Sequence, residues 1–159
     1  LGVYLASTSS METHVNYVFF LFNQRLYLIN QLRKQGLSAK AREVVFHSLV
    51  ISRLLYALPA FVGFLSGADI ARFNSVFRKS VRWGIIDRMF DFDELSISSQ
   101  DQLFKRFSSN VNHCLHQLLP ELRNTCYMLR QRGHSFSLPV VSRTLFKKSF
   151  VVNYLYSHM

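Results

Sequence analysis

The sequence predicts a mainly α protein: a three-helix bundle, a second small helical block, and a residual β-strand at the N-terminus. Three observations lead to this prediction. Of the 159 residues, 49% are hydrophobic, so the chain can bury a core. Only six Gly and three Pro occur, which disfavours the many tight turns of an all-β fold. Apolar residues also recur every three or four positions through most of the chain, as in amphipathic helices.

Residues 1–8, which begin "LGVYLA", have the composition of a β-strand. No partner strand follows them in the sequence, and a lone strand leaves its backbone groups without hydrogen bonds. We therefore expect the chain to be a piece of a longer protein whose sheet lies upstream.

Helix starts are indicated by three capping boxes, Ser9/Glu12, Ser66/Asp69 and Ser98/Asp101. In this motif the Ser side chain accepts from a backbone amide three residues on, and the acid reaches back to the cap. Each of the three precedes an apolar helical period, which strengthens the prediction.

The predicted bundle, residues 9–84, contains helices over 11–34, 39–57 and 67–83. Gly36, Pro59 and Gly84 are expected to end them, and Ser38 to cap the second. Short connections make the first two helices antiparallel neighbours. The expected inward residues are Val15, Phe19, Phe22, Leu26, Ile29 and Leu32 in the first helix, Ala41, Val44, Val45, Ser48, Leu49, Ser52, Leu55 and Tyr56 in the second, and Ile70, Phe73, Phe77 and Val81 in the third.

Residues 85–97 contain four acids and are predicted to be an acidic linker. Residues 98–159 form the second helical block, with a helix over 99–118, a shorter one over 121–131, an extended loop over 132–141, and a helix from Ser142. The inward residues expected for the helix over 99–118 are Leu103, Phe107, Val111, Cys114, Leu115 and Leu118.

Charge is the main functional signal. The net charge is +10, and residues 1–86 carry ten Lys/Arg against three acids. A basic globular chain typically meets nucleic acid or an anionic membrane, although a solvated basic surface is the alternative. On the third helix the cations fall opposite the apolar sector. The candidate nucleic-acid-binding residues are Arg72, Arg78, Lys79, Arg82 and Trp83, with Arg33, Lys34, Lys40 and Arg42 near the first loop.

Membrane insertion and secretion are not expected. Residues 44–65 are long enough to cross a bilayer, but Arg53 lies near their centre, at a cost of about 2.5–3.5 kcal/mol on insertion scales. Two cysteines, no Asn-X-Ser/Thr sequon and no signal peptide favour an intracellular compartment over secretion.

No catalytic residue, metal, cofactor or small-molecule substrate is predicted. The acids of "DFDE" at 91–94 lie in the predicted linker, with no partner acid on a strand to help hold Mg²⁺. His113, Cys114, His116 and Cys126 lack the spacing of a zinc site. No nucleophile motif, P-loop or dinucleotide fingerprint is present.

The order of several segments resembles the C-terminal part of reverse transcriptases from LINE-type (non-LTR) retrotransposons. These segments are "LGVYL", "NQRLYLINQLRKQGLS", "VFHSLVISRLLYALPAFVGFLS" and "FNSVFRKSVRWGI", followed by "LLPELRNTCYMLRQRGHSFSLP". Within them, Leu54–Ala60 is similar to the family pattern Leu-X-Tyr-Ala-X-Pro-Ala.

The resemblance implies that residues 1–8 are the last strand of a palm domain and that residues 9–84 are a thumb-like bundle. The implied function is a non-catalytic clamp on a template–primer duplex, RNA–DNA or DNA, working with upstream fingers and palm. The family's Ala-Asp-Asp motif is absent, so Mg²⁺ and polymerisation would belong to the missing palm.

Two alternatives remain. Residues 16–37 are also similar to the N-terminal helical segment of AlkB-homologue tRNA-modifying proteins, but the iron ligands His-X-Asp are absent, so no oxygenase activity is expected. The other alternative is a helical protein–protein interaction module, with Phe-rich surfaces that dock a partner.

Overall fold

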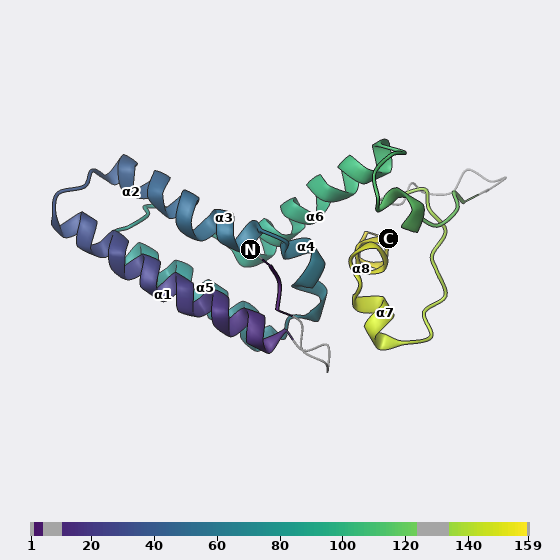
Figure 1. The fold of residues 1–159 in the computed structure, drawn as a ribbon, viewed down its shortest axis with the longest axis horizontal. Helices are drawn as coiled ribbons and strands as arrows, with labels where there is room; N and C mark the ends of the chain where they lie inside the picture. The colour runs from purple at the N-terminus through teal and green to yellow at the C-terminus, as the bar shows by residue number, and fades with distance from the viewer. Residues whose placement is uncertain (1, 5–10, 124–133, 159) are drawn as a thin grey trace.

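Helices make up most of the chain in the computed structural model, which describes residues 2–4, 11–123 and 134–158 (Figure 1). The mainly α fold class is therefore confirmed. In chain order the elements are α1 (Glu12–Lys34), α2 (Ala39–Phe46), the π-helical turn η1 (His47–Ile51), α3 (Ser52–Leu55), α4 (Leu58–Phe61), the 3₁₀ turn η2 (Val62–Phe64), α5 (Gly67–Arg82), α6 (Phe92–Ser109), the 3₁₀ turn η3 (His116–Leu118), α7 (Thr144–Lys148) and α8 (Phe150–Ser157).

The predicted N-terminal strand is not present in residues 2–4, the described part of the range 1–8. Instead, the backbone N–H of Tyr4 donates to the His14 ring, with 3.5 Å between Tyr4 N and His14 Nδ1. Of the Ser9/Glu12 capping box, Ser9 lies outside the described residues. Helix α1 begins at Glu12, and its cap residue, Met11, packs into the core.

Helices α1 and α5 run parallel along their shared core. Asn16 contacts Arg72, and seven residues further on Asn23 contacts Lys79, so a separation of 56 residues is kept along both helices. Between them, the rings of Phe19 and Phe73 stack with their centroids 4.6 Å apart. The inward residues predicted for α1 are buried, except for Leu32, which is exposed near the end of the helix.

The second predicted helix is α2, η1 and α3 in succession, and its predicted inward face is only partly correct, since Val45 and Leu55 pack against the main core but several other members do not. Val44, Leu49 and Tyr56 are exposed. The residues that enter the core are Phe46, Val50, Ile51 and Leu54. This segment is apolar on several sides, and the extra residue of the π turn shifts the buried stripe. A count at ordinary α-helical spacing therefore selects the wrong face.

The break predicted at Pro59 is confirmed, although the helical backbone resumes at once. Helix α3 ends at Leu55, and Ala57 takes a left-handed conformation with φ of 56°. Pro59 lies in the first turn of α4, where its missing N–H costs no helical hydrogen bond. Gly36 and Gly84 also have positive φ directly after α1 and α5, as their predicted role as helix stops requires.

The acidic residues 85–97 are not a plain linker. Ile85, Ile86 and Phe90 join the main core, and α6 already begins at Phe92. Asp91 caps α6, since its Oδ1 accepts from Asp93 N at 3.0 Å, and the acids of the first turn complement the helix dipole.

The C-terminal half of the second block has its own small core. Phe104 and Phe107 of α6 pack against Val151, Tyr154 and Leu155 of α8. The predicted cap at Ser98 is wrong because Ser98 lies inside α6. Helix α6 ends at Ser109, so Val111, Cys114 and Leu118, which were predicted to point inward, are exposed.

The C-terminal segment agrees more closely with the prediction from the sequence. Residues 134–141 are extended and irregular, with an isolated bridge between Leu122 and Phe136, and α7 and α8 follow the predicted start at Ser142. Most of the helix predicted over 121–131 lies outside the described residues, and residues 121–123 are not helical.

One helical stretch, Ala39–Phe64, is long and apolar enough to cross a membrane by length and composition. It carries Arg53 and is interrupted at Ala57, and residues such as Phe46 and Leu54 on it are fully buried against the other helices. The absence of a membrane interaction stays a prediction.

Candidate nucleic-acid interface

The outer face of α5 carries two exposed arginines, Arg78 and Arg82, for which the described part of the chain provides no hydrogen bond, ion pair or ring contact from the side chain. The local sequence explains why this helix forms: Ser66 and Asp69 make the predicted capping box, with 3.2 Å between Asp69 N and Ser66 Oγ. Phe73, Val76, Phe77 and Ser80 are buried and hold the opposite face on the core. Arg78 and Arg82 therefore point to solvent.

Arg72 and Lys79 lie at the seam where α5 meets α1. Arg72 Nη2 donates to Asn16 Oδ1 at 3.0 Å, and its guanidinium lies 4.2 Å from the centre of the Phe19 ring. It also makes an exposed ion pair with Asp69 at 3.6 Å. Seven residues on, Lys79 Nζ donates to Asn23 Oδ1 at 3.2 Å. Both cations are thus positioned by neutral amides, and Asp69 is the one acid that pairs with either of them within the described residues.

Trp83 contacts the main core and the side chain of Lys79. It is half-buried against the main core, and Lys79 Nζ lies 4.5 Å above its ring as a cation–π contact. Trp83, a candidate nucleic-acid-binding residue from the sequence, thus packs between the core and Lys79. Its effect on ligand binding would act through the position of Lys79.

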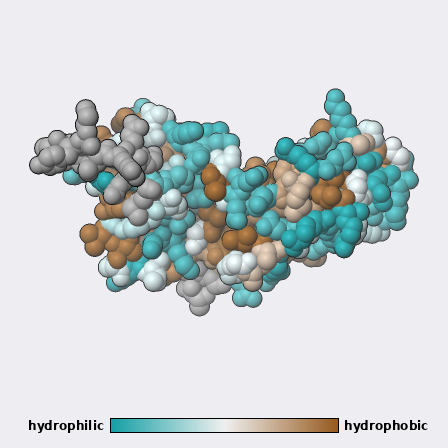
Figure 2. Space-filling model, turned by 180° about the vertical axis from the view of Figure 1, so that it is seen from behind, coloured by the Kyte–Doolittle hydropathy of each residue, from teal (hydrophilic) through white to brown (hydrophobic). Residues whose placement is uncertain are grey.

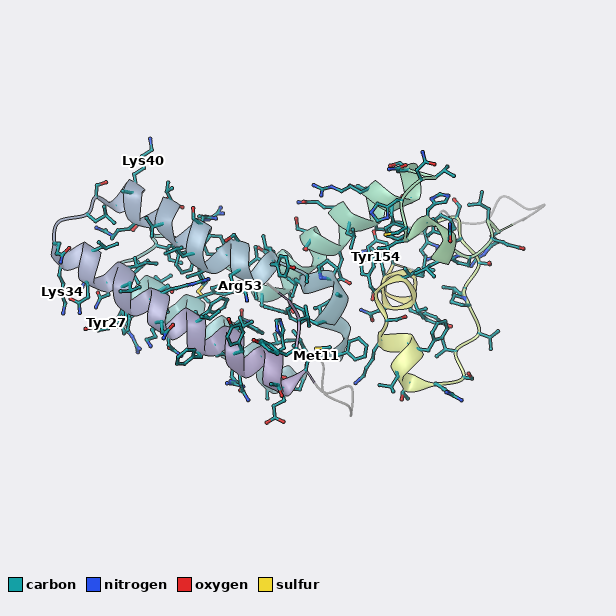
Figure 3. The ribbon with its side chains drawn as sticks, in the orientation of Figure 1. Met11, Tyr27, Lys34, Lys40, Arg53 and Tyr154 are labelled. Carbon is teal, nitrogen blue, oxygen red and sulfur yellow. The ribbon has the colours of Figure 1, made fainter. Side chains whose placement is uncertain are left out.

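The four cations near the α1–α2 turn do not all lie on one side of the molecule. Arg33 donates to Asn30 Oδ1 at 3.2 Å and lies beside Gly84, so it extends the seam between α1 and α5. Lys34 projects from the same side of α1 as Tyr27, whereas Lys40 projects from α2 in the opposite direction (Figure 3). The structure therefore does not gather all the predicted residues on one surface.

Arg42 has a structural role. Its Nη1 donates to the carbonyl oxygen of Leu37 at 2.7 Å, which fixes the turn before α2. Its Nε is buried without a hydrogen-bond partner among the described residues. Because the guanidinium is used in the turn, Arg42 is a poor candidate for contact with a ligand.

Two exposed aromatic residues on α1, Phe20 and Tyr27, were missed by the sequence reasoning. Their side chains are 58% and 59% exposed. They lie seven residues apart, so they share a face of α1, and this face adjoins the row of Asn16 and Asn23. The signal was available, because both residues fall outside the predicted apolar stripe. Aromatic rings beside cations are a common arrangement for binding nucleic acid.

Acids are scarce on this part of the molecule. The sequence has no Asp or Glu from residue 13 to 42 or from residue 70 to 86, the ranges that include most of α1 and α5. Seen from behind, hydrophilic side chains cover much of the half built by α1, α2 and α5, with apolar patches between them (Figure 2). The cations of this half therefore produce a positive surface that few carboxylates offset.

The side chains of Asp101, Tyr154 and His158 form a polar cluster in the half of the molecule that contains α6 and α8. Tyr154 Oη donates to Asp101 Oδ1 at 2.8 Å, and His158 Nε2 lies 3.4 Å from the same oxygen. Burial, and then the bond to Asp101, raise the pKa of Tyr154 well above its usual range. The cluster joins α6 to α8. Within the described residues, no group of three or more His, Cys, Asp or Glu side chains is placed to hold a metal ion.

Comparison with protein-family models, with curated proteins and with solved structures finds no match for this chain. Function is therefore inferred from the contacts, burial and charge of the chain itself.

Proposed function

We propose that the chain grips a nucleic-acid duplex, RNA–DNA or DNA, through a cation track formed by Arg72, Arg78, Lys79 and Arg82 of α5 with Arg33 and Lys34 of α1. The role is that of the thumb and post-thumb part of a non-LTR reverse transcriptase. In this role the chain positions the duplex, while polymerisation and Mg²⁺ binding are functions of the fingers and palm of such an enzyme.

The observation that carries the proposal is the scarcity of compensating acids along the track within the described residues. Asp69 is the only acid that pairs with one of its cations within the described residues, and this pair is exposed, so it adds little stability. Each Lys or Arg that reaches a phosphate displaces condensed counterions, which makes binding favourable and salt-dependent. The neutral amides of Asn16 and Asn23 hold two of the cations in place without neutralising them.

The test is the double variant Arg78→Glu with Arg82→Glu, measured by fluorescence anisotropy with a labelled duplex between about 50 and 200 mM salt. Both residues are exposed and make no side-chain hydrogen bond, ion pair or ring contact within the described part of the chain, so the fold should survive. We expect a large loss of affinity and a salt slope shallower by about two, since two phosphate contacts are lost.

The matched control is Lys105→Glu with Arg106→Glu, which makes the same charge change on the exposed surface of α6. If both double variants weaken binding equally, the attraction is due to net charge and not to the track. If the α5 variant binds like the unaltered protein, Arg78 and Arg82 are not part of the interface.

The second candidate function, a helical protein–protein module, is favoured by one observation. Phe20, Tyr27 and Leu28 are each more than half exposed on α1, and exposed apolar residues gathered on one helix are typical of docking surfaces. Sedimentation velocity separates the two candidates. Self-association that does not change with salt and is abolished by Phe20→Ala with Tyr27→Ala supports the protein–protein module, and salt-sensitive duplex binding by a monomer supports the cation track.

A further inference from the structure

A cleft of about 230 Å³ lies between α1 and α3, away from the cation track. It is lined by Gly2, Tyr4, Tyr17, Leu21, Arg25 and Arg53. Arg53 reaches from α3 toward α1 (Figure 3). Arg25 belongs to α1, so the two arginines line the cleft from different helices. Two guanidinium groups in one small cleft require a physical explanation, because like charges repel.

Arg25 is held in place by the π turn. Its Nη1 donates to the carbonyl oxygen of Leu49, which lies inside η1. A π turn disturbs the regular helical hydrogen bonds, and a side chain can then reach a backbone carbonyl that an α-helix would use. A guanidinium has five N–H donors, and the backbone carbonyl oxygen of Leu49 is the one hydrogen-bond acceptor that Arg25 has within the described residues. Its remaining donors are available to a ligand.

Arg53 is positioned by aromatic rings and not by an acid. Its guanidinium carbon lies 5.8 Å from the ring centre of Tyr17 and 5.9 Å from that of Tyr56. Tyr4 packs edge-on against Tyr17, with 5.1 Å between the ring centres, and closes one side of the cleft. Cation–π contacts orient the Arg53 guanidinium but leave its charge and its N–H groups free to act on an anion.

No carboxylate offsets these two charges. None lines the cleft among the described residues, and the sequence has no Asp or Glu from residue 44 to 68. Burial, followed by the charge of Arg53, lowers the pKa of Arg25, and the same two causes lower the pKa of the neighbouring His14. The fold therefore maintains an uncompensated positive potential at this position.

We propose that this cleft binds a phosphate group through the guanidinium groups of Arg25 and Arg53. Arginine forks match the geometry of phosphate oxygens and form charge-assisted hydrogen bonds with them. The cleft lies on the side of α1 that faces α3, whereas the cation track lies along α5. Phosphate binding here therefore does not depend on duplex binding by the track.

The experiment uses the whole chain and inorganic phosphate as the first probe. The melting temperature is measured against phosphate concentration, with chloride at matched ionic strength, and affinity is measured by calorimetry. We expect a saturable rise in melting temperature. Arg53→Gln should weaken phosphate binding by about tenfold or more, because one of the two charge-assisted contacts is lost.

The control is Arg88→Gln, which removes the same charge from another arginine held by a ring, 4.7 Å from the centre of Phe90. It should bind phosphate like the unaltered protein. Arg53→Lys, which keeps the charge but loses the fork, should show an intermediate affinity, and it replaces Arg53→Gln if circular dichroism shows that the Gln variant is unfolded.

Two further probes, a nucleoside and its 5′-monophosphate, distinguish the source of the phosphate. Tighter binding of the monophosphate than of inorganic phosphate assigns the cleft to a nucleotide whose base contacts the tyrosines, and equal binding assigns it to phosphate alone. The proposal is overturned if phosphate gives no rise in melting temperature, if Arg53→Gln responds like Arg88→Gln, or if the nucleoside binds as well as the monophosphate.

Discussion

His14 is the one imidazole among the described residues that is almost fully buried, with 3% of its surface exposed. Its Nδ1 accepts from the backbone N–H of Tyr4, and its ring packs edge-on against Phe61 with the centres 4.9 Å apart. Burial, and secondly the charge of Arg53, lower the pKa of His14 below its ordinary value of 6.5. The folded protein therefore resists protonation of this ring.

The consequence is a loss of stability in acid. Between the lowered pKa in the folded state and about 6.5 in the unfolded state, the unfolded chain binds the extra proton. The stabilising contribution of neutral His14 is therefore present above about pH 6.5 and decreases as the pH falls below it. We expect the free energy of unfolding, measured by urea titration, to decrease less between about pH 7 and 5 in His14→Gln than in the unaltered protein. Parallel curves for the two proteins would contradict this assignment.

Ala57 has a left-handed backbone conformation, with φ of 56°, although it carries a Cβ. That conformation costs an L-residue about 1–2 kcal/mol, and Gly adopts it without this penalty. After allowing for the greater freedom of Gly in the unfolded chain, we expect Ala57→Gly to raise the free energy of unfolding by about 0.5–1 kcal/mol.

Ala60, in the short helix α4, provides the control for Ala57. Ala60→Gly should lower the free energy of unfolding by up to about 1 kcal/mol, because Gly disfavours a helix. Urea titration of the two variants measures whether each change raises or lowers the free energy of unfolding. A loss of stability in both would show that the αL turn is not strained.

Helices were predicted well where one face alone is apolar and less well elsewhere. In α5 the cap, the buried Phe73 and Phe77, and the stop at Gly84 all agree with the pattern. The segment from α2 to α3 is apolar on several sides, so its period is ambiguous, and the π turn is a tertiary feature that spacing does not reveal. The register of α1 against α5 could not be predicted from the sequence either, because the residues that contact each other, such as Asn16 and Arg72, are far apart in it.

Contact between η2 and the C-terminal helices depends on Gly63. A Cβ added at this position would overlap with the backbone carbonyl of Lys148 and would also crowd the side chain of Asn153. Backbone cannot give way as a flexible side chain does. We therefore expect Gly63→Ala to lower the free energy of unfolding by about 1–3 kcal/mol and to increase hydrogen exchange in α8.

Gly67 is the matched control for Gly63, because a Cβ there meets nothing within 4 Å. It lies at the first position of α5, where Ala is the better helix former, so Gly67→Ala should be neutral or stabilising. Equal destabilisation by both variants would show that the overlap with Lys148 does not decide the result.

The described residues form two cores, and α6 takes part in both. Its first residue, Phe92, is buried in the main core, while Phe104 and Phe107 near its end belong to the smaller one. The smaller core has few large buried side chains, so its share of the stability is limited. The two halves of the molecule can then differ in local stability.

Phe107→Ala tests this difference. Removing a fully buried ring costs about 3–5 kcal/mol, and the cost should fall on the smaller core. We expect hydrogen exchange to rise in α8 and in the last turns of α6, while amides in α1 and α5 stay protected. Val111→Ala, at a highly exposed position just after α6, should change neither. Equal loss of protection in α1 and α8 would show one cooperative unit.

The candidate site shows what the order of residues by itself determines about this protein. Positive charge, scarcity of acids and the amphipathic pattern of α5 are properties of local sequence, so the basic face with Arg78 and Arg82 was predictable. These properties depend on neighbours within a few residues, which is the range over which helical periodicity operates.

Tertiary structure alone decided which cations lie together. It placed Arg72 and Lys79 beside asparagines of a parallel helix, used Arg42 inside a turn, turned Lys40 away, and brought Arg25 and Arg53 into one cleft. The physical reason is that side-chain function is set by contacts across the core. Those contacts depend on the register and direction of packed helices, which the one-dimensional pattern does not encode.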